Sequence, residues 1–260
     1  MATTDQPDKD FVKAFLTGLG FLVEEIRADS DENSSDLFAS ADKECHYIEV
    51  KRRLSIPRVL SNLRQDPEEG HSYYYLEHST GYSNKLAGKL RYASKQLDSS
   101  ASSGASSFRL VWYLTTGPDT AVIQSQLRAT LYGIRSVGFR WPNGMWSHLP
   151  CYYSSDSVFF RFRDSIDCVV VGDNFQAQLC LNNHSSRYEA LSQSLLTQRF
   201  GEAIIDPTQQ ESSGKGFQIK GDVDRRTDQA VLDYVSSKYG VKAVCLFDPE
   251  DHRVELILPT

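Results

Sequence analysis

The stretch CHYIEVKRR, residues 45–53, decides how this chain is expected to fold. Apolar and polar residues alternate along it, which is typical of a β-strand that buries one face. In such a strand Ile48 and Val50 point into a core. Glu49 and Lys51 then point away from that core, so an acid and a base lie two residues apart on one side of the strand.

A second acidic residue stands at the start of the preceding strand. Residues 36–40 (DLFAS) predict a short strand with the spacing of a hairpin to residues 45–53. Asp36 opens it, so its carboxylate can meet Glu49 and Lys51 at one edge of the sheet. Two carboxylates there can hold a hard divalent cation, with waters completing the shell. A lysine beside them can orient a water or stabilise developing charge, which phosphodiester hydrolysis needs.

This spacing also has a simpler interpretation. An acid and a lysine two residues apart occur in many amphipathic strands, where they form a solvated ion pair across strands. The surrounding order, α-β-β-β-α-β, favours the catalytic interpretation. Its other elements are a helix over 8–19, a strand over 21–27, a helix over 83–98 and a buried strand over 108–115. Within residues 54–82, a short helix over 57–65 is expected, and three tyrosines at 73–75 suit a strand or an exposed loop.

This pattern resembles the PD-(D/E)xK nuclease superfamily over residues 8–116. The motif is Asp36…Glu49-Val50-Lys51, written SSDL…YIEVKRR. The resemblance implies an α/β fold, with a restriction endonuclease-like α-β-β-β-α-β core built on a mixed sheet. It implies Mg²⁺ or Mn²⁺ bound by Asp36, Glu49 and the Val50 carbonyl. It also implies that Lys51 positions or activates the attacking water.

The family commonly keeps a further polar residue on the helix after the motif, and Gln96 or Lys95 is the candidate here. Two positions depart from the pattern. Ser35 replaces the proline that often precedes the first acid. Lys9 stands where many relatives carry a glutamate in the first helix, which favours a site for one metal ion over a site for two.

The charge is unevenly distributed along the chain. The net charge is -6, but residues 43–95 carry an excess of basic side chains while the preceding segment is strongly acidic. A local basic segment can attract a polyanion even where the whole protein is acidic. Solvated surface is the simpler interpretation. The residues expected to contact nucleic acid are Arg52, Arg53, Lys85, Lys89, Arg91 and Lys95.

The rest of the chain predicts a smaller α+β appendage. The expected division is a nuclease domain over 1–172 and a C-terminal α+β domain over 173–260. A strand is expected at 157–163. The C-terminal part is expected to contain helices over 185–199 and 225–239, followed by a terminal hairpin of 241–248 with 252–258. Substrate choice or assembly is assigned to this part, because the motif lies entirely upstream.

Composition limits the class of protein. The chain is 40% hydrophobic and 24% charged, which is a globular balance, and no run of 18 apolar residues predicts a membrane span. The polar N-terminus and the five scattered cysteines indicate a cytoplasmic protein. The expected function is that of a divalent-metal-dependent endonuclease that hydrolyses phosphodiester bonds, with DNA as substrate. The alternative is a non-catalytic nuclease-like module that binds nucleic acid or a partner protein. The sequence does not determine whether the protein forms a homodimer.

Overall fold

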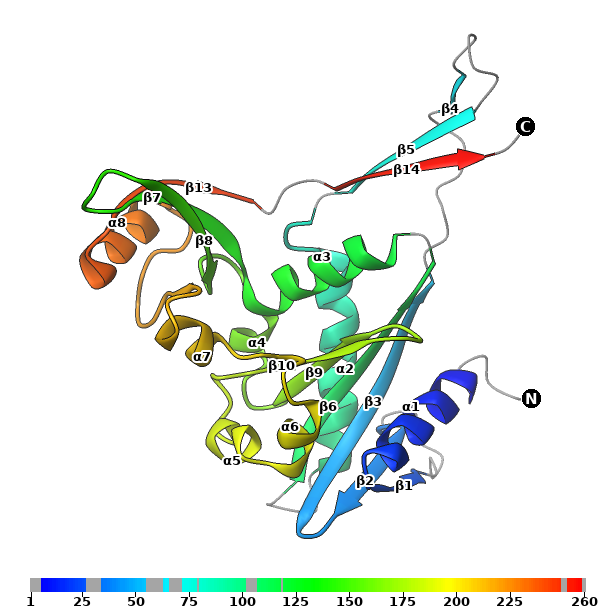
Figure 1. The fold of residues 1–260 in the computed structure, drawn as a ribbon. Helices are drawn as coiled ribbons and strands as arrows, with labels where there is room; N and C mark the ends of the chain where they lie inside the picture. The colour runs from blue at the N-terminus through cyan, green and yellow to red at the C-terminus, as the bar shows by residue number, and fades with distance from the viewer. Residues whose placement is uncertain are drawn as a thin grey trace.

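A seven-stranded sheet of mixed direction forms the centre of the fold in the computed structural model (Figure 1). The structure describes residues 6–26, 34–54, 63–65, 72–78, 80–101, 107–117, 119–248 and 252–258. The strand order is β1-β2-β3-β6-β9-β10-β11. Their bounds are β1 Leu22–Glu25, β2 Leu37–Ala41, β3 Glu44–Leu54, β6 Ser107–Thr116, β9 Cys168–Gly172, β10 Ala177–Leu181 and β11 Ile204–Ile205.

The sheet has a parallel centre with antiparallel neighbours. Strands β3, β6 and β9 run parallel, whereas β1, β2 and β3 form an antiparallel meander. Strand β10 turns back against β9 and pairs in parallel with β11. The central strand β6 is buried along almost its whole length, as its continuous apolar sequence requires.

Helices cover both faces of this sheet (Figure 1). Helix α1 (Gln6–Gly18) packs on one face, and helices α2 (Asn84–Ala101) and α3 (Thr120–Tyr132) pack on the other. Alternation along the strands divides the core accordingly: Ile48 and Trp112 face α1, while Val111 and Tyr113 face α2 and α3. The elements follow the expected α-β-β-β-α-β order, with β4 (Leu63–Gln65) and β5 (Ser72–His78) inserted before α2.

A second sheet of four strands lies beside the large one, in the order β12-β8-β7-β13. Its strands are β7 Arg135–Arg140, β8 Trp146–Tyr152, β12 Phe217–Gln218 and β13 Lys242–Phe247. Helix α8 (Asp228–Tyr239) packs against β13. The other helices are α4 Val158–Arg161, α5 Tyr188–Ser192, α6 Leu195–Phe200 and α7 Pro207–Ser212. No helix in the described ranges is long and apolar enough to cross a membrane.

The expected terminal hairpin is wrong. Strand β13 pairs antiparallel with β7, and the last strand, β14 (His252–Leu258), pairs antiparallel with β5 in a third sheet of order β14-β5-β4. The two final strands are therefore neighbours in sequence but belong to different sheets. Short-range turn signals could not identify these partners, because each partner lies more than a hundred residues upstream.

Two local expectations are also corrected. Residues 157–163 were expected to form a strand, but Ser157 caps the short helix α4 by accepting a hydrogen bond from the Phe160 amide. The single helix expected over 185–199 is two short helices, α5 and α6, because Ser194 caps a new start there.

The expected domain boundary at 172–173 falls in the turn of a hairpin. Strands β9 and β10 on its two sides pair within the large sheet, and β11 continues that sheet. The division into domains stays a prediction, but the sheet that carries the motif extends past it. Residues 55–62, most of the expected helix over 57–65, lie outside the described residues. The tyrosines at 73–75 lie on β5.

Candidate active site

Asp36 lies directly before β2, where β3 extends beyond its pairing with β2. The pairing of β2 with β3 ends at Leu37 and Ile48. The Asp36 amide donates to the Ile48 carbonyl (3.0 Å), and Asp36 Oδ2 accepts a hydrogen bond from the Val50 amide (2.8 Å). The N–H and C=O of one strand residue point to the same side. The Val50 carbonyl therefore faces the same open edge as the Asp36 carboxylate.

Glu49 is a buried carboxyl group with one unsatisfied oxygen. Its side chain is 1% exposed, Oε1 contacts the Lys51 ammonium, and Oε2 has no hydrogen-bond partner among the described residues. Burial, followed by the charge of Asp36, raises the pKa of Glu49 to about 8, and Lys51 opposes this increase. The expected pair of carboxylates is thus brought together, and the unpaired Oε2 atom is an available acceptor.

Lys51 and Gln96 connect the strand to helix α2. Register pairing with Val111 and Tyr113 places Glu49 and Lys51 on the α2 face of the sheet. The Lys51 ammonium donates to Gln96 Oε1 at 3.0 Å. Of the two helix residues proposed from the sequence, Gln96 reaches the motif, whereas Lys95 is exposed.

Lys9 enters the site from helix α1. Its ammonium lies 2.6 Å from Asp36 Oδ1, and it also senses the charge of Glu49. Burial alone would lower the pKa of Lys9, but the hydrogen bond to Asp36 and the charges of both acids outweigh it and raise the pKa. The sequence marked Lys9 as a departure from the family pattern, but it did not predict this contact. Each carboxylate of the motif therefore has its own lysine.

These donor atoms suit one hard divalent cation. The Asp36 carboxylate, the unpaired Glu49 Oε2 and the open Val50 carbonyl are oxygen ligands of the type that Mg²⁺ and Mn²⁺ prefer. Lys9 competes for Asp36, so an ion would have to share or displace it. In the described part of the chain, no cluster of three or more His, Cys, Asp or Glu side chains is placed to hold a metal ion.

The expected nucleic-acid contacts divide into two groups. Lys85, Arg91 and Lys95 are exposed on α2. The other three have protein partners: Arg52 pairs with Asp8 at 2.7 Å, Arg53 approaches Gln126 at 3.5 Å, and Lys89 donates to the Arg52 carbonyl at 3.0 Å. The exposed cations of this set are therefore on the helix and not on the strand.

An exposed aromatic residue lies among the cations of helix α2, and it was not identified from the sequence. Tyr92 is 61% exposed, and Arg91 and Lys95 lie 5.8 and 6.0 Å from its ring. Tyr92 precedes Gln96 by one helical turn, so it lies on the helix face that leads to the motif. The spacing of 92 and 96 within the predicted helix could have identified it.

Comparison of the chain with protein-family models, curated proteins and solved structures gave no significant match. The assignment of function therefore rests on the residues and geometry of the site.

Proposed function

We propose that this chain is a divalent-metal-dependent nuclease of the PD-(D/E)xK type, with DNA as its substrate. The observation that carries the proposal is a convergence of side chains from β3, from α2 and from the residue before β2: Glu49 and Lys51, Gln96, and Asp36. The observed order of helices and strands supports a restriction endonuclease-like core. A chance acid-x-Lys pair on a solvated strand would not bury its acid and adjoin a second carboxylate.

The residues have separate roles in this proposal. Asp36, Glu49 and the Val50 carbonyl would hold Mg²⁺ or Mn²⁺, which supplies charge stabilisation at the scissile phosphate when bound. Lys51 would orient the attacking water and stabilise negative charge that develops on the phosphate. Gln96 holds the Lys51 ammonium through its side-chain carbonyl and so fixes its direction. Glu49 itself is shielded from bulk water, whereas Asp36 and Lys51 stay partly exposed, so a substrate and a water can reach them.

Helix α2 would bind the nucleic-acid backbone and position it beside the motif. Its exposed cations, Lys85, Arg91 and Lys95, suit phosphate contacts, and Tyr92 offers a face on which an unpaired base can stack. Contacts of this kind position a strand without reading its sequence. We therefore assign the helix to substrate binding in general and not to sequence recognition.

A second candidate function is a non-catalytic module that binds nucleic acid or a partner protein. The contact between Lys9 and Asp36 favours it, because an internal cation already neutralises one of the two acids. A protein whose Asp36 is neutralised by Lys9 can retain the fold and the basic helix but lack catalytic activity.

Nuclease assays on the purified protein distinguish the two functions. Plasmid DNA, single-stranded DNA and RNA would be incubated with Mg²⁺, with Mn²⁺ and with chelator. Metal-dependent cleavage that falls about 10²–10³-fold in Lys51→Ala and persists in Lys43→Ala, a lysine on the turn before β3, supports the nuclease. Binding of nucleic acid without cleavage under every condition supports the non-catalytic module.

A further inference from the structure

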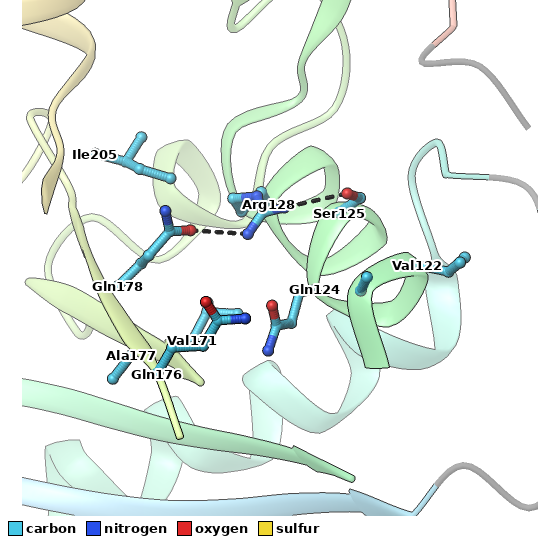
Figure 2. Close-up of a pocket in the computed structure, with 10 residues that line it drawn as sticks. Val122, Gln124, Ser125, Arg128, Val171, Gln176, Ala177, Gln178 and Ile205 are labelled. Carbon is cyan, nitrogen blue, oxygen red and sulfur yellow. Dashed lines mark hydrogen bonds between the residues drawn. The ribbon is translucent and has the colours of Figure 1, made fainter. Parts of the chain in front are cut away.

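A pocket of about 630 Å³ lies on the far side of helix α3 from the motif, between α3, the β9–β10 hairpin and β11 (Figure 2). This volume is within the range of small-molecule sites. Apolar side chains on its walls include Val122, Val171 and Ile205. Polar side chains project from α3 and from β10 and the turn before it, as Figure 2 shows.

Arg128 alone carries a charge among the described residues that line the pocket. Its guanidinium is oriented by two neutral groups, donating to Gln178 Oε1 at 2.9 Å and to Ser125 Oγ at 3.1 Å (Figure 2). No carboxylate in the described part of the chain forms an ion pair with it. The contrast with other arginines is clear: Arg109 and Arg187 each meet an aspartate at 2.8 Å.

A guanidinium held in this way is prepared for an anion. Five N–H donors point from Arg128 in a fixed fork, and Gln178 and Ser125 engage two of its nitrogens without neutralising the charge. Such a fork matches the oxygens of a carboxylate or phosphate. One cation suits one anionic group, so a ligand with a single phosphate fits better than a diphosphate or triphosphate.

The rest of the wall suits a flat polar group. The side-chain amides of Gln124 and Gln176 both donate to Asp173, at 3.4 and 3.5 Å, and Gln124 also donates to Thr115 at 3.1 Å. These contacts hold the two amides in place before a ligand arrives. Because its amide nitrogen already donates to two partners, Gln124 offers its side-chain carbonyl to a donor edge of a nucleobase. The valine and isoleucine side chains offer an apolar surface to a ring.

We propose that this pocket binds a nucleoside monophosphate, with the phosphate on Arg128 and the base between the glutamine amides and the apolar wall. The proposal rests on the pocket and does not require nuclease activity. It assigns to the protein a small-molecule site separate from the motif.

Calorimetric titration in the presence of chelator tests this inference. The probes are the four 5′-ribonucleoside monophosphates, each compared with its nucleoside and with inorganic phosphate. We expect at least one monophosphate to bind at least about tenfold more tightly than either of its parts. No binding by any of the four, or equal binding by inorganic phosphate alone, would overturn the proposal.

Two variants locate the binding. Arg128→Met removes the cation, and Gln178→Glu supplies the missing carboxylate at an exposed position, so it neutralises Arg128 without opening the core. Both should weaken nucleotide binding about tenfold or more, and Gln178→Glu should do so in a folded protein, as circular dichroism can verify. The control is Arg199→Met, an exposed arginine on α6. Unchanged affinity in Gln178→Glu, or an equal loss in Arg199→Met, would contradict the proposal.

Discussion

Two regions of the large sheet each contain a side chain that lacks a partner of opposite charge or polarity: an acid in one region and an arginine in the other. At β3, the buried Glu49 keeps an acceptor oxygen without a partner among the described residues, although two lysines lie beside the acids. Beside β10, Arg128 contacts neutral groups and has no carboxylate partner among the residues that the structure describes. The first arrangement can accept a cation and the second an anion. Where a fold leaves a polar group without its natural counterpart, the missing group indicates the chemistry of a ligand.

Strand register relates the two regions. Lys51, Tyr113, Val171 and Gln178 are successive register partners across β3, β6, β9 and β10. They therefore lie in one row on the α2 and α3 face of the sheet, and the ends of the row are about 14 Å apart at the usual strand spacing. The buried Tyr113 and Val171 separate the two regions, so changes in one are expected to leave the other intact.

The largest expected effect comes from the motif itself. Asp36→Ala and Glu49→Ala should each abolish metal binding and cleavage, because each removes a proposed ligand. Lys51→Ala should retain metal binding but lower the cleavage rate by about 10²–10³, as for the loss of one preorganised electrostatic group. Calorimetric metal titration and a nuclease assay on each folded variant measure this, with exposed Glu24→Ala on β1 as control. If all three motif variants cleave at the rate of the unmodified protein, then these residues form a structural ion-pair cluster and are not catalytic.

The next effect is on stability against pH. The folded protein holds the Glu49 proton up to about pH 8, whereas the unfolded chain releases it near the ordinary value of 4.5. The unfolded state therefore binds fewer protons between these values, so the free energy of unfolding of the metal-free protein should fall as pH rises from 5 to 8. We expect a decrease on the order of 4 kcal/mol. Urea unfolding measures it, and an equally steep decrease in Glu49→Gln would exclude Glu49 as its source.

Lys9 gives a smaller and more specific effect. Lys9→Met removes the cation that competes for Asp36, so divalent metal should bind about tenfold more tightly, as expected for the loss of one charge-assisted contact. Lys13→Met changes an exposed lysine on the same helix and should leave affinity unchanged. If both variants match the parent, then Lys9 does not control entry of the ion.

The smallest effect concerns helix α2. Replacing Lys85 and Lys95 by glutamine should weaken binding to duplex DNA uniformly across sequences. It should also reduce the slope of log affinity against log salt by about 2, because two fewer counterions are released. The control replaces the exposed Arg199 and Lys215, which lie on other elements. Fluorescence anisotropy at several salt concentrations measures the slopes. If the helix substitutions leave the slope unchanged, then other residues contact the DNA phosphates.

The sequence predicted what depends on local periodicity. Alternation along β3 placed Glu49 and Lys51 on one face, and hairpin spacing brought Asp36 beside them. The contact of Lys9 with Asp36 could not be predicted, because it depends on how α1 docks against the sheet edge. The pocket was missed for the same reason, since Arg128 and Gln178 lie fifty residues apart and meet only in the folded chain.

The separation of β7 from its partner β13 has a consequence for the order of folding during synthesis. Every strand of the large sheet has left the ribosome once residue 205 has emerged, whereas the second sheet waits for residue 247. At about 5–20 residues per second this interval lasts roughly 2 to 8 s. During it, the β13-facing edge of β7 lacks its partner, while the sheet that carries the motif can already assemble. We therefore expect the motif to acquire its geometry before the second sheet closes, and the third sheet, which needs β14, to close after both.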